Sequence, residues 1–190
     1  MDTEPERLPV ELVPHRAEWA QMARDEAQRL CDTIGQSIVV EIHHIGSTSI
    51  PGIHAKPTID LMPLVTNLSA LDTREAAVCA LGYEWRGEFG IPGRRFITRM
   101  SEDRRKRLFN VHCFEASMPD VDRHLAFRDY MRAHPDRAKA YAAEKFRARD
   151  VQPDDTLAYS REKSAWIKAA EQEALTWYRA QIKSPARRAP

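Results

Sequence analysis

The segment 43–65, HHIGSTSIPGIHAKPTIDLMPLV, constrains the fold more than any other part of the chain. It begins as an apolar, strand-like run, breaks at Gly46 and Ser47, passes two prolines, and resumes as a second apolar run. The second run carries one acid, Asp60, and an acid inside an apolar strand is costly to bury unless it binds a metal or a hydrogen-bond donor. The segment therefore predicts two strands joined by a polar turn that precedes a lone buried carboxylate.

The rest of the chain predicts further strands and helices in a fixed order. Runs rich in β-branched and aromatic residues predict strands at 37–46, 57–65, 82–87, 94–100 and 108–116. Helical spacing of apolar residues predicts helices at 18–31, 69–81, 120–134, 136–150 and 159–182. This order indicates an α+β (or α/β) fold with a mixed sheet flanked by helices and a helical C-terminal third. We expect a flexible arm at 1–12, a single domain at 13–182 and a disordered tail at 183–190.

Composition narrows the class of protein. The chain is 43% hydrophobic and 30% charged, as in ordinary globular proteins, and its 29 basic residues nearly balance 28 acidic ones. Nothing in this balance indicates a nucleic-acid partner, and no apolar run is long enough to span a bilayer. Three widely spaced cysteines without a secretory leader fit a reducing compartment. We expect a cytoplasmic protein with no membrane partner.

The chemistry of the Gly-Ser turn has two interpretations. Gly46 permits close approach of another group, and Ser47 and Thr48 offer hydroxyl and N–H donors. If a short helix begins there, its N-terminus would favour phosphate, and Asp60 downstream would favour Mg²⁺, which prefers carboxylate and phosphate oxygens. The alternative is a polar turn in which Asp60 merely caps the end of a strand.

Several longer segments carry a resemblance to a known family. HHIGSTSIPGIHAKPTIDL, NVHCFEA, HLAFRDYMRAHPDRAKAYAAEKFRA and YSREKSAWI resemble the GrpB family over residues 13–177. GrpB proteins are similar to the nucleotidyltransferase superfamily, whose signature is a Gly-Ser pair, a strand with Asp-x-Asp or Asp-x-Glu, and a later strand with a third acid. The resemblance implies that Gly46 and Ser47 bind phosphate, with Thr48 beside them, and that Asp60 is the first ligand of Mg²⁺ or Mn²⁺.

The chain departs from that signature at one position. Side chains two apart share a strand face, so a second acid should stand at position 62, where this chain has Met62. A two-metal transfer needs acids to hold both ions. Glu115 is our candidate for a later metal ligand and catalytic carboxylate, and His112 for a ligand or a base. Because His112 and Glu115 face opposite sides of a regular strand, we do not expect both in one site.

Three basic residues complete the predicted site. Lys56 lies four residues before Asp60, where it can neutralise phosphate charge or remain a solvated loop lysine. One of Arg94 and Arg95 should face the sheet surface that carries Asp60, and we assign Arg95 to the phosphate site. Lys163, in a segment that resembles the family, is expected at the pocket rim.

Two functions follow from the resemblance. The first is a metal-dependent nucleotidyl- or phosphoryl-transferase that acts on a nucleoside triphosphate and a small-molecule acceptor. The second is a non-catalytic module that binds a nucleotide or phosphorylated metabolite, because the likeness extends to domains fused to dephospho-CoA kinase. The absence of an acid at Met62 favours the module, whereas Ser47, Lys56, Asp60 and His112 favour the enzyme, which is our prediction.

Overall fold

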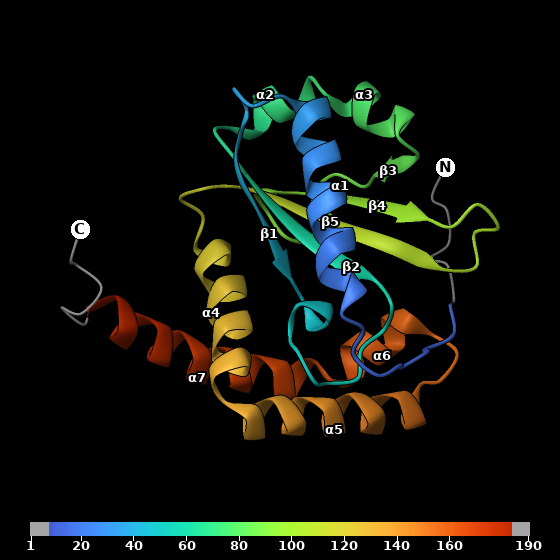
Figure 1. The fold of residues 1–190 in the computed structure, drawn as a ribbon, viewed down its shortest axis with the longest axis vertical. Coiled ribbons are helices and arrows are strands. Elements are labelled where there is room, and N and C mark those ends of the chain that lie inside the picture. Colours follow the sequence, from blue (N-terminus) through green and yellow to red (C-terminus); the bar gives the residue numbers. More distant parts are fainter. Residues whose placement is uncertain (1–7, 184–190) are drawn as a thin grey trace.

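The computed structural model describes residues 8–183 and is built around one five-stranded mixed sheet (Figure 1). The strands are β1 (Val39–Ile45), β2 (Ile59–Val65), β3 (Tyr83–Trp85), β4 (Arg94–Met100) and β5 (Arg107–Glu115). Their order across the sheet is β1-β2-β5-β4-β3. Only β2 and β5 run parallel, and the other neighbours are antiparallel. The predicted α+β fold with a mixed sheet is confirmed.

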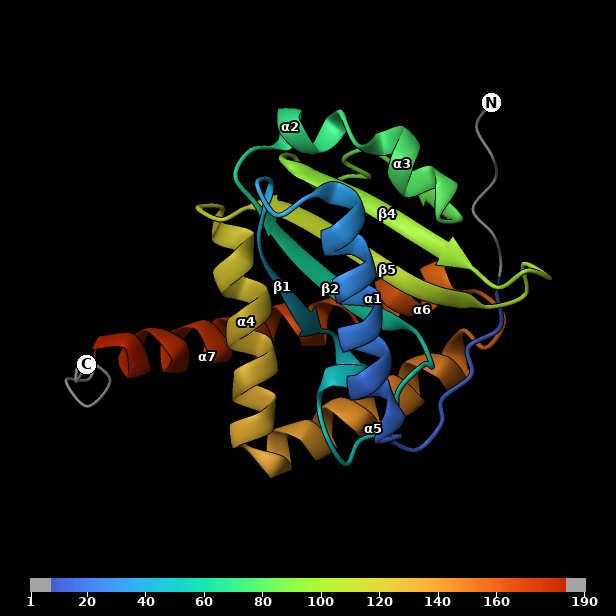
Figure 2. The same cartoon turned by 45° about the horizontal axis from the view of Figure 1, so that its top comes forward.

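Helices cover both faces of the sheet. The first group is α1 (Glu18–Ile34), α2 (Leu68–Asp72) and α3 (Glu75–Ala80), and the second is α4 (Pro119–Ala133), α5 (Pro135–Val151), α6 (Thr156–Glu162) and α7 (Ser164–Lys183). Figure 2 shows α1 in front of the sheet, with α6 and α7 behind it. The second group confirms the predicted helical C-terminal third. The helix predicted at 69–81 is instead two short helices, and the side chain of Asn67 caps the first by accepting from the N–H of Ala70 at 2.7 Å.

Strand alternation decides which residues lie under which helices. The odd-numbered side chains of the central strands, among them Leu61 and Val111, pack with Trp19 and Leu30 of α1 in the main apolar core. Since successive side chains point to opposite faces, the even-numbered residues of β2 and β5 face the C-terminal helices. Asp60 of β2 and Asn110 and His112 of β5 therefore share one face of the sheet.

The described end of the predicted arm is packed against the domain. Val10 is 6% exposed, clusters with Ala148 and Tyr159, and donates its N–H to the carbonyl of Pro153 at 2.7 Å. Val10 of the predicted arm thus packs against the helical C-terminal third, while the flexibility of the arm stays a prediction. Residues 1–7 and the predicted tail from residue 184 onward lie outside the described residues, and the bounds of the predicted domain stay a prediction. Within 8–183, no helix is both long enough and apolar enough to cross a membrane.

A buried polar network joins α1 to strands β3 and β4 at one edge of the sheet. Glu26 of α1 is 6% exposed, and one of its carboxylate oxygens accepts from the hydroxyl of Tyr83 at 2.7 Å and from Arg99 at 2.8 Å. Burial, together with the bond to Glu26, raises the pKa of Tyr83. This carboxylate thus satisfies a donor from β3 and a donor from β4 at once.

We expect Glu26→Ala to lower the free energy of unfolding by about 2 kcal/mol, because it leaves the donors of Tyr83 and Arg99 without their acceptor. Urea denaturation measures the change. Asp25→Ala, at the exposed neighbouring position of α1, is the control and should change stability by less than about 0.5 kcal/mol. Equal effects of the two substitutions would show that the network contributes nothing specific.

Candidate functional site

The turn after β1 lies directly against Asp60. Gly46 has φ +69°, and a Cβ placed on it would lie 2.2 Å from Oδ2 of Asp60, closer than any side-chain atom can approach. The antiparallel register pairs Ile45 with Asp60, which brings the turn to this position. Glycine is therefore required at position 46 by the backbone conformation and by the acid together.

The turn itself is held by hydrogen bonds. It forms the single 3-10 turn η1 (Ser47–Ser49), in which the Ser49 hydroxyl donates to the carbonyl of Gly46 at 2.7 Å. Arg132 of α4 donates to the carbonyl of Ser49 at 2.9 Å. Thr48 is 1% exposed and is hydrogen-bonded to His44 at 3.0 Å, so its hydroxyl is directed away from the cavity that Ser47 lines. The prediction that Thr48 contacts a ligand therefore disagrees with its placement.

Asp60 is surrounded by donors. Nδ2 of Asn110, on the parallel strand β5, donates to Oδ1 of Asp60 at 2.8 Å, and Nε2 of His112 lies 3.8 Å from the same oxygen. Burial opposes ionisation, but the nearby His112, the hydrogen bond from Asn110 and the charge of Lys56 outweigh it and hold the pKa of Asp60 below its ordinary value. Asp60 is therefore a carboxylate at neutral pH.

His112 is oriented from its other side by Arg94. The guanidinium of Arg94 donates to Nδ1 of His112 at 3.3 Å, so the proton of the neutral ring stands on Nε2, the atom that faces Asp60. Arg94 is itself fixed by donating to the backbone carbonyl of Phe89 at 2.6 Å. The chain Arg94, His112, Asp60 forms one oriented polar network.

A cavity of about 240 Å³ lies over Asp60 and is rich in lysine. Burial lowers the pKa of Lys56 to about 8 and that of Lys145 to about 7, in both cases with a contribution from the charge of Lys163. Burial also lowers the pKa of Lys163. The rest of the lining includes Ser47, Asn110, His112, His124, Tyr141, Tyr159 and Ser160. Three ammonium groups thus share a confined space with one carboxylate, an arrangement that an anion would stabilise.

The structure brings together six of the residues predicted for the site: Gly46, Ser47, Lys56, Asp60, His112 and Lys163. The prediction is wrong for Arg95, which forms a two-bond ion pair with Asp72 at 2.7 and 2.8 Å on the α2 side of the sheet. Strand alternation puts its neighbour Arg94 on the face of Asp60 instead.

Glu115 also lies on the other face. Its Oε1 accepts from the N–H of Leu68 at 3.0 Å, at the start of α2. Glu115 therefore caps a helix and cannot share a metal ion with Asp60, as its opposite parity to His112 indicated. The prediction of Glu115 as a metal ligand and catalytic carboxylate of this site is wrong.

Asn110 and Lys145 are among the site residues that the sequence analysis missed. Asn110 stands two residues before His112 in an otherwise apolar alternation, and this period-two spacing of polar residues was a readable signal. Lys145 lies one helical turn after Tyr141, but it is a lysine in a highly charged segment, and nothing distinguishes it there from a solvated residue. Only the packing of α5 shows that its side chain is buried, with Nζ donating to the carbonyl of His54.

The surroundings of Asp60 offer few further metal ligands. Across residues 8–183, no group of three or more His, Cys, Asp and Glu side chains is arranged to hold a metal ion. Met62, where the second acid was expected, is fully buried and packs with Ile45 and Phe114. With Asp60 as the one acid of this face at the cavity, the residues present do not fit a pair of metal ions.

Comparisons with known proteins agree on one family. A family model described as GrpB protein matches residues 9–173. UPF0157 protein YqkA of Bacillus subtilis is 41% identical over 168 residues, which are 88% of this chain but 48% of YqkA, so the chain spans about half the length of that relative. UPF0157 protein SCO7215 of Streptomyces coelicolor is 35% identical over 90% of this chain and 87% of its own length.

A kinase and a solved structure are also similar. A protein named dephospho-CoA kinase from Mycolicibacterium paratuberculosis is 28% identical over 90% of this chain and 47% of its own length. The crystal structure of the conserved protein GrpB from Enterococcus faecalis superposes with a TM-score of 0.82 at 34% identity, covering 88% of this chain and 99% of that one.

We expect Gly46→Ala to destabilise the fold far more than Gly52→Ala. Both glycines have positive φ, but a Cβ on Gly52 meets nothing within 4 Å, so that substitution costs only the conformational term of about 1 kcal/mol. Gly46→Ala adds the clash with Asp60, worth about 2 kcal/mol or more. Thermal and urea unfolding measure both. If the two substitutions still differ after Asp60→Gly removes the clash, the close approach is not the cause.

Proposed function

The chain belongs to the GrpB family, and on that premise we propose that it binds a nucleotide or a related phosphorylated metabolite, with the phosphates in the cavity over Asp60. The observation that carries this proposal is the gathering of Lys56, Lys145 and Lys163 around a single carboxylate. A nucleotide ligand accords with the cytoplasmic location expected from the sequence.

Among the described residues that line the cavity, Asp60 is the one carboxylate beside three lysines. None of the ion pairs found within residues 8–183 involves Lys56, Lys145 or Lys163, although the same residues contain many arginine–carboxylate pairs. Lys145 donates to a backbone carbonyl, and the ammonium groups of Lys56 and Lys163 lie 5.5 and 5.1 Å from the ring centre of Tyr159. Phosphate oxygens would give the ammonium groups of Lys56 and Lys163 charge-assisted hydrogen bonds.

The relatives named dephospho-CoA kinase support a phosphorylated ligand. Each contains a segment similar to 90% of this chain, and the name denotes a kinase of dephospho-CoA. The matched segment is under half of those proteins. For this chain we therefore propose binding of a related phosphorylated ligand, and we do not propose kinase activity.

A second candidate function is metal-dependent nucleotidyl or phosphoryl transfer to a small-molecule acceptor. The observation that favours it is the ionised Asp60 beside Oδ1 of Asn110, a buried acceptor without a hydrogen-bond partner. Asp60 would hold Mg²⁺ or Mn²⁺ jointly with phosphate oxygens, and the ion would neutralise phosphate charge during transfer. His112 and Asn110 orient the carboxylate, while the three lysines hold the phosphates.

We expect ATP, GTP, CTP or UTP to bind with uptake of protons at pH 8. At that pH, Lys56 and Lys145, with pKa values of about 8 and 7, are partly neutral, and bound phosphates restore their charge. Because a lowered lysine pKa means that the charge is lost as pH rises through it, affinity should fall as pH rises above about 7. Calorimetry in two buffers of different ionisation enthalpy measures the protons taken up.

Two lysine variants make this measurement specific. Lys56→Gln should lower the affinity about tenfold and reduce the proton uptake, since a charge-assisted bond is lost. Lys139→Gln, at a lysine whose side chain is 78% exposed on α5, should match the wild type. Failure of all four nucleotides to bind, or an unchanged proton uptake in Lys56→Gln, would refute the proposal.

For the second candidate, we expect Mg²⁺ to tighten nucleotide binding in the wild type and to have no effect in Asp60→Asn. The amide keeps the shape of the carboxylate but loses the charge that a hard cation needs. Without Mg²⁺, Asp60→Asn should bind nucleotide at least as tightly as the wild type, because one negative charge leaves the cavity. Asp72→Asn, on the opposite face, is the control. An equal Mg²⁺ effect in all three proteins would exclude Asp60 as the ligand.

A further inference from the structure

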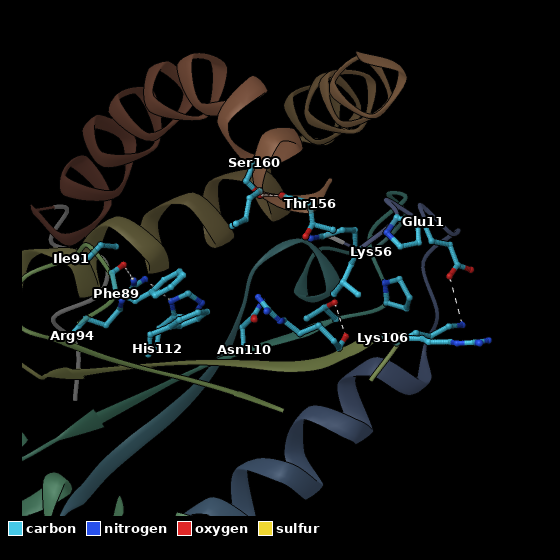
Figure 3. A pocket seen from close by; sticks show the side chains of 18 residues that line it. Glu11, Lys56, Phe89, Ile91, Arg94, Lys106, Asn110, His112, Thr156 and Ser160 are labelled. Atoms are coloured by element: carbon cyan, nitrogen blue, oxygen red, sulfur yellow. Dashed lines mark hydrogen bonds and ion pairs between the residues drawn. The ribbon is translucent and has the colours of Figure 1, made fainter. Parts of the chain in front are cut away.

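A second, wider cavity of about 460 Å³ adjoins the lysine-rich one (Figure 3). The two share part of their lining, namely Lys56, Thr58, Asn110, His112 and Ser160. Figure 3 shows Asn110 and His112 on the floor of this groove and Thr156 above it, from α6. One end is charged, at the ion pair of Lys106 with Glu11, and the other end is aromatic, at Phe89.

Phe89 has an unusual conformation for an aromatic residue. Its backbone has φ +43°, a left-handed value that bulky side chains rarely adopt, and the residue is 51% exposed. Its ring stacks on that of Phe96, with centres 5.3 Å apart and planes 27° apart. Phe96 is only 6% exposed and also contacts Arg94 and His112, so Phe89 is the member of this group with a free face. Core packing does not account for the exposed ring.

The loop that carries Phe89 is braced. Arg94 donates to the carbonyl of Phe89 at 2.6 Å and to that of Glu88 at 3.2 Å, and the N–H of Gly93 donates to the Glu88 carboxylate at 2.7 Å. The ring is therefore presented to the groove from a loop held in place before any ligand arrives. Such preorganisation reduces the entropy cost of binding.

The distance between Asp60 and the aromatic end of the groove determines how long a ligand must be to reach both. Asp60 is paired with Asn110 across β2 and β5, and His112 is paired with Phe96 across β5 and β4. Phe96 is therefore two strands across the sheet from Asp60 and two residues further along. The spacing between strands and the rise per residue give roughly 12 Å between the Cα atoms of Asp60 and Phe96. This separation is comparable to the length of a nucleoside that carries one phosphate.

We infer that the aromatic end of the groove binds the planar heteroaromatic ring of the ligand, a nucleobase, by stacking it on Phe89. The inference rests on the proposed function, because the phosphates of the same ligand would lie among the lysines over Asp60. Charge separates the two halves of the ligand: the anionic part faces Lys56 and Lys163, and the apolar part faces Phe89 and Ile91. Stacking accepts any base, so specificity among bases would come from other contacts.

The test compares ATP, GTP, CTP and UTP with inorganic tripolyphosphate, which carries the phosphates without a ring. Calorimetry on the wild-type protein should give at least one nucleotide that binds about tenfold more tightly than tripolyphosphate, the order expected for one stacked base. Phe89→Ala should remove this advantage and leave tripolyphosphate binding unchanged. Phe89→Trp should retain it, because a ring remains.

The controls separate the ring site from the phosphate site. Alanine at position 89 meets the same positive φ as phenylalanine, so the backbone cost is similar, and Val151→Ala tests loss of an apolar side chain of equal exposure elsewhere. Equal affinity of nucleotides and tripolyphosphate, or a Phe89→Ala loss shared by tripolyphosphate, would overturn the ring site alone. Failure of all five compounds to bind would overturn the proposed function and the ring site with it.

Discussion

The contact between Gly46 and Asp60 is the constraint on which the site depends. The carboxylate of Asp60 needs a hydrogen-bond donor, and its other oxygen needs space that no neighbouring side chain fills. Asn110 supplies the donor from β5, and the α-carbon of Gly46 supplies the room from the end of β1. Residues that are 14 positions apart in sequence therefore form one unit, because the antiparallel register of β1 and β2 brings them together.

The same contact determines the course of the connection from β1 to β2. The chain must leave the turn at Gly46 and return to the start of β2 without covering Asp60. It does so by packing Ile50 and Ile53 into an apolar cluster with residues of α4, α5 and α7, including Met131 and Tyr141. The returning segment then places Lys56 in the cavity. The helical C-terminal third thus supports the loop as well as supplying Lys145 and Lys163.

The sequence predicts those features of the site that depend on the alternation of side chains within one strand. It does not predict the features that depend on how two strands pair. Alternation within β5 already separates His112 from Glu115, and it would have added Asn110 to the His112 face. It cannot decide between Arg94 and Arg95, because parity within β4 says nothing about the register with β5. Asp60 and Asn110 are 50 residues apart and meet through a parallel pairing that neither strand encodes alone. The strands and helices were predictable because they follow from local periodicity, whereas the register that brings Asn110 to Asp60 was not.

The position of α4 explains why position 62 does not carry a second acid. Met62 shares the face of Asp60 but lies further along β2, where Ile45, Phe114 and Val121 of α4 surround it. This cluster excludes water, and a carboxylate at position 62 would be buried there without a donor, at a cost of several kcal/mol. The helix closes the part of the sheet on which a second ion would need ligands, and it leaves the part with Asp60 open to the lysines. If the proposed phosphate binding holds, any transfer chemistry at this site has to use one carboxylate.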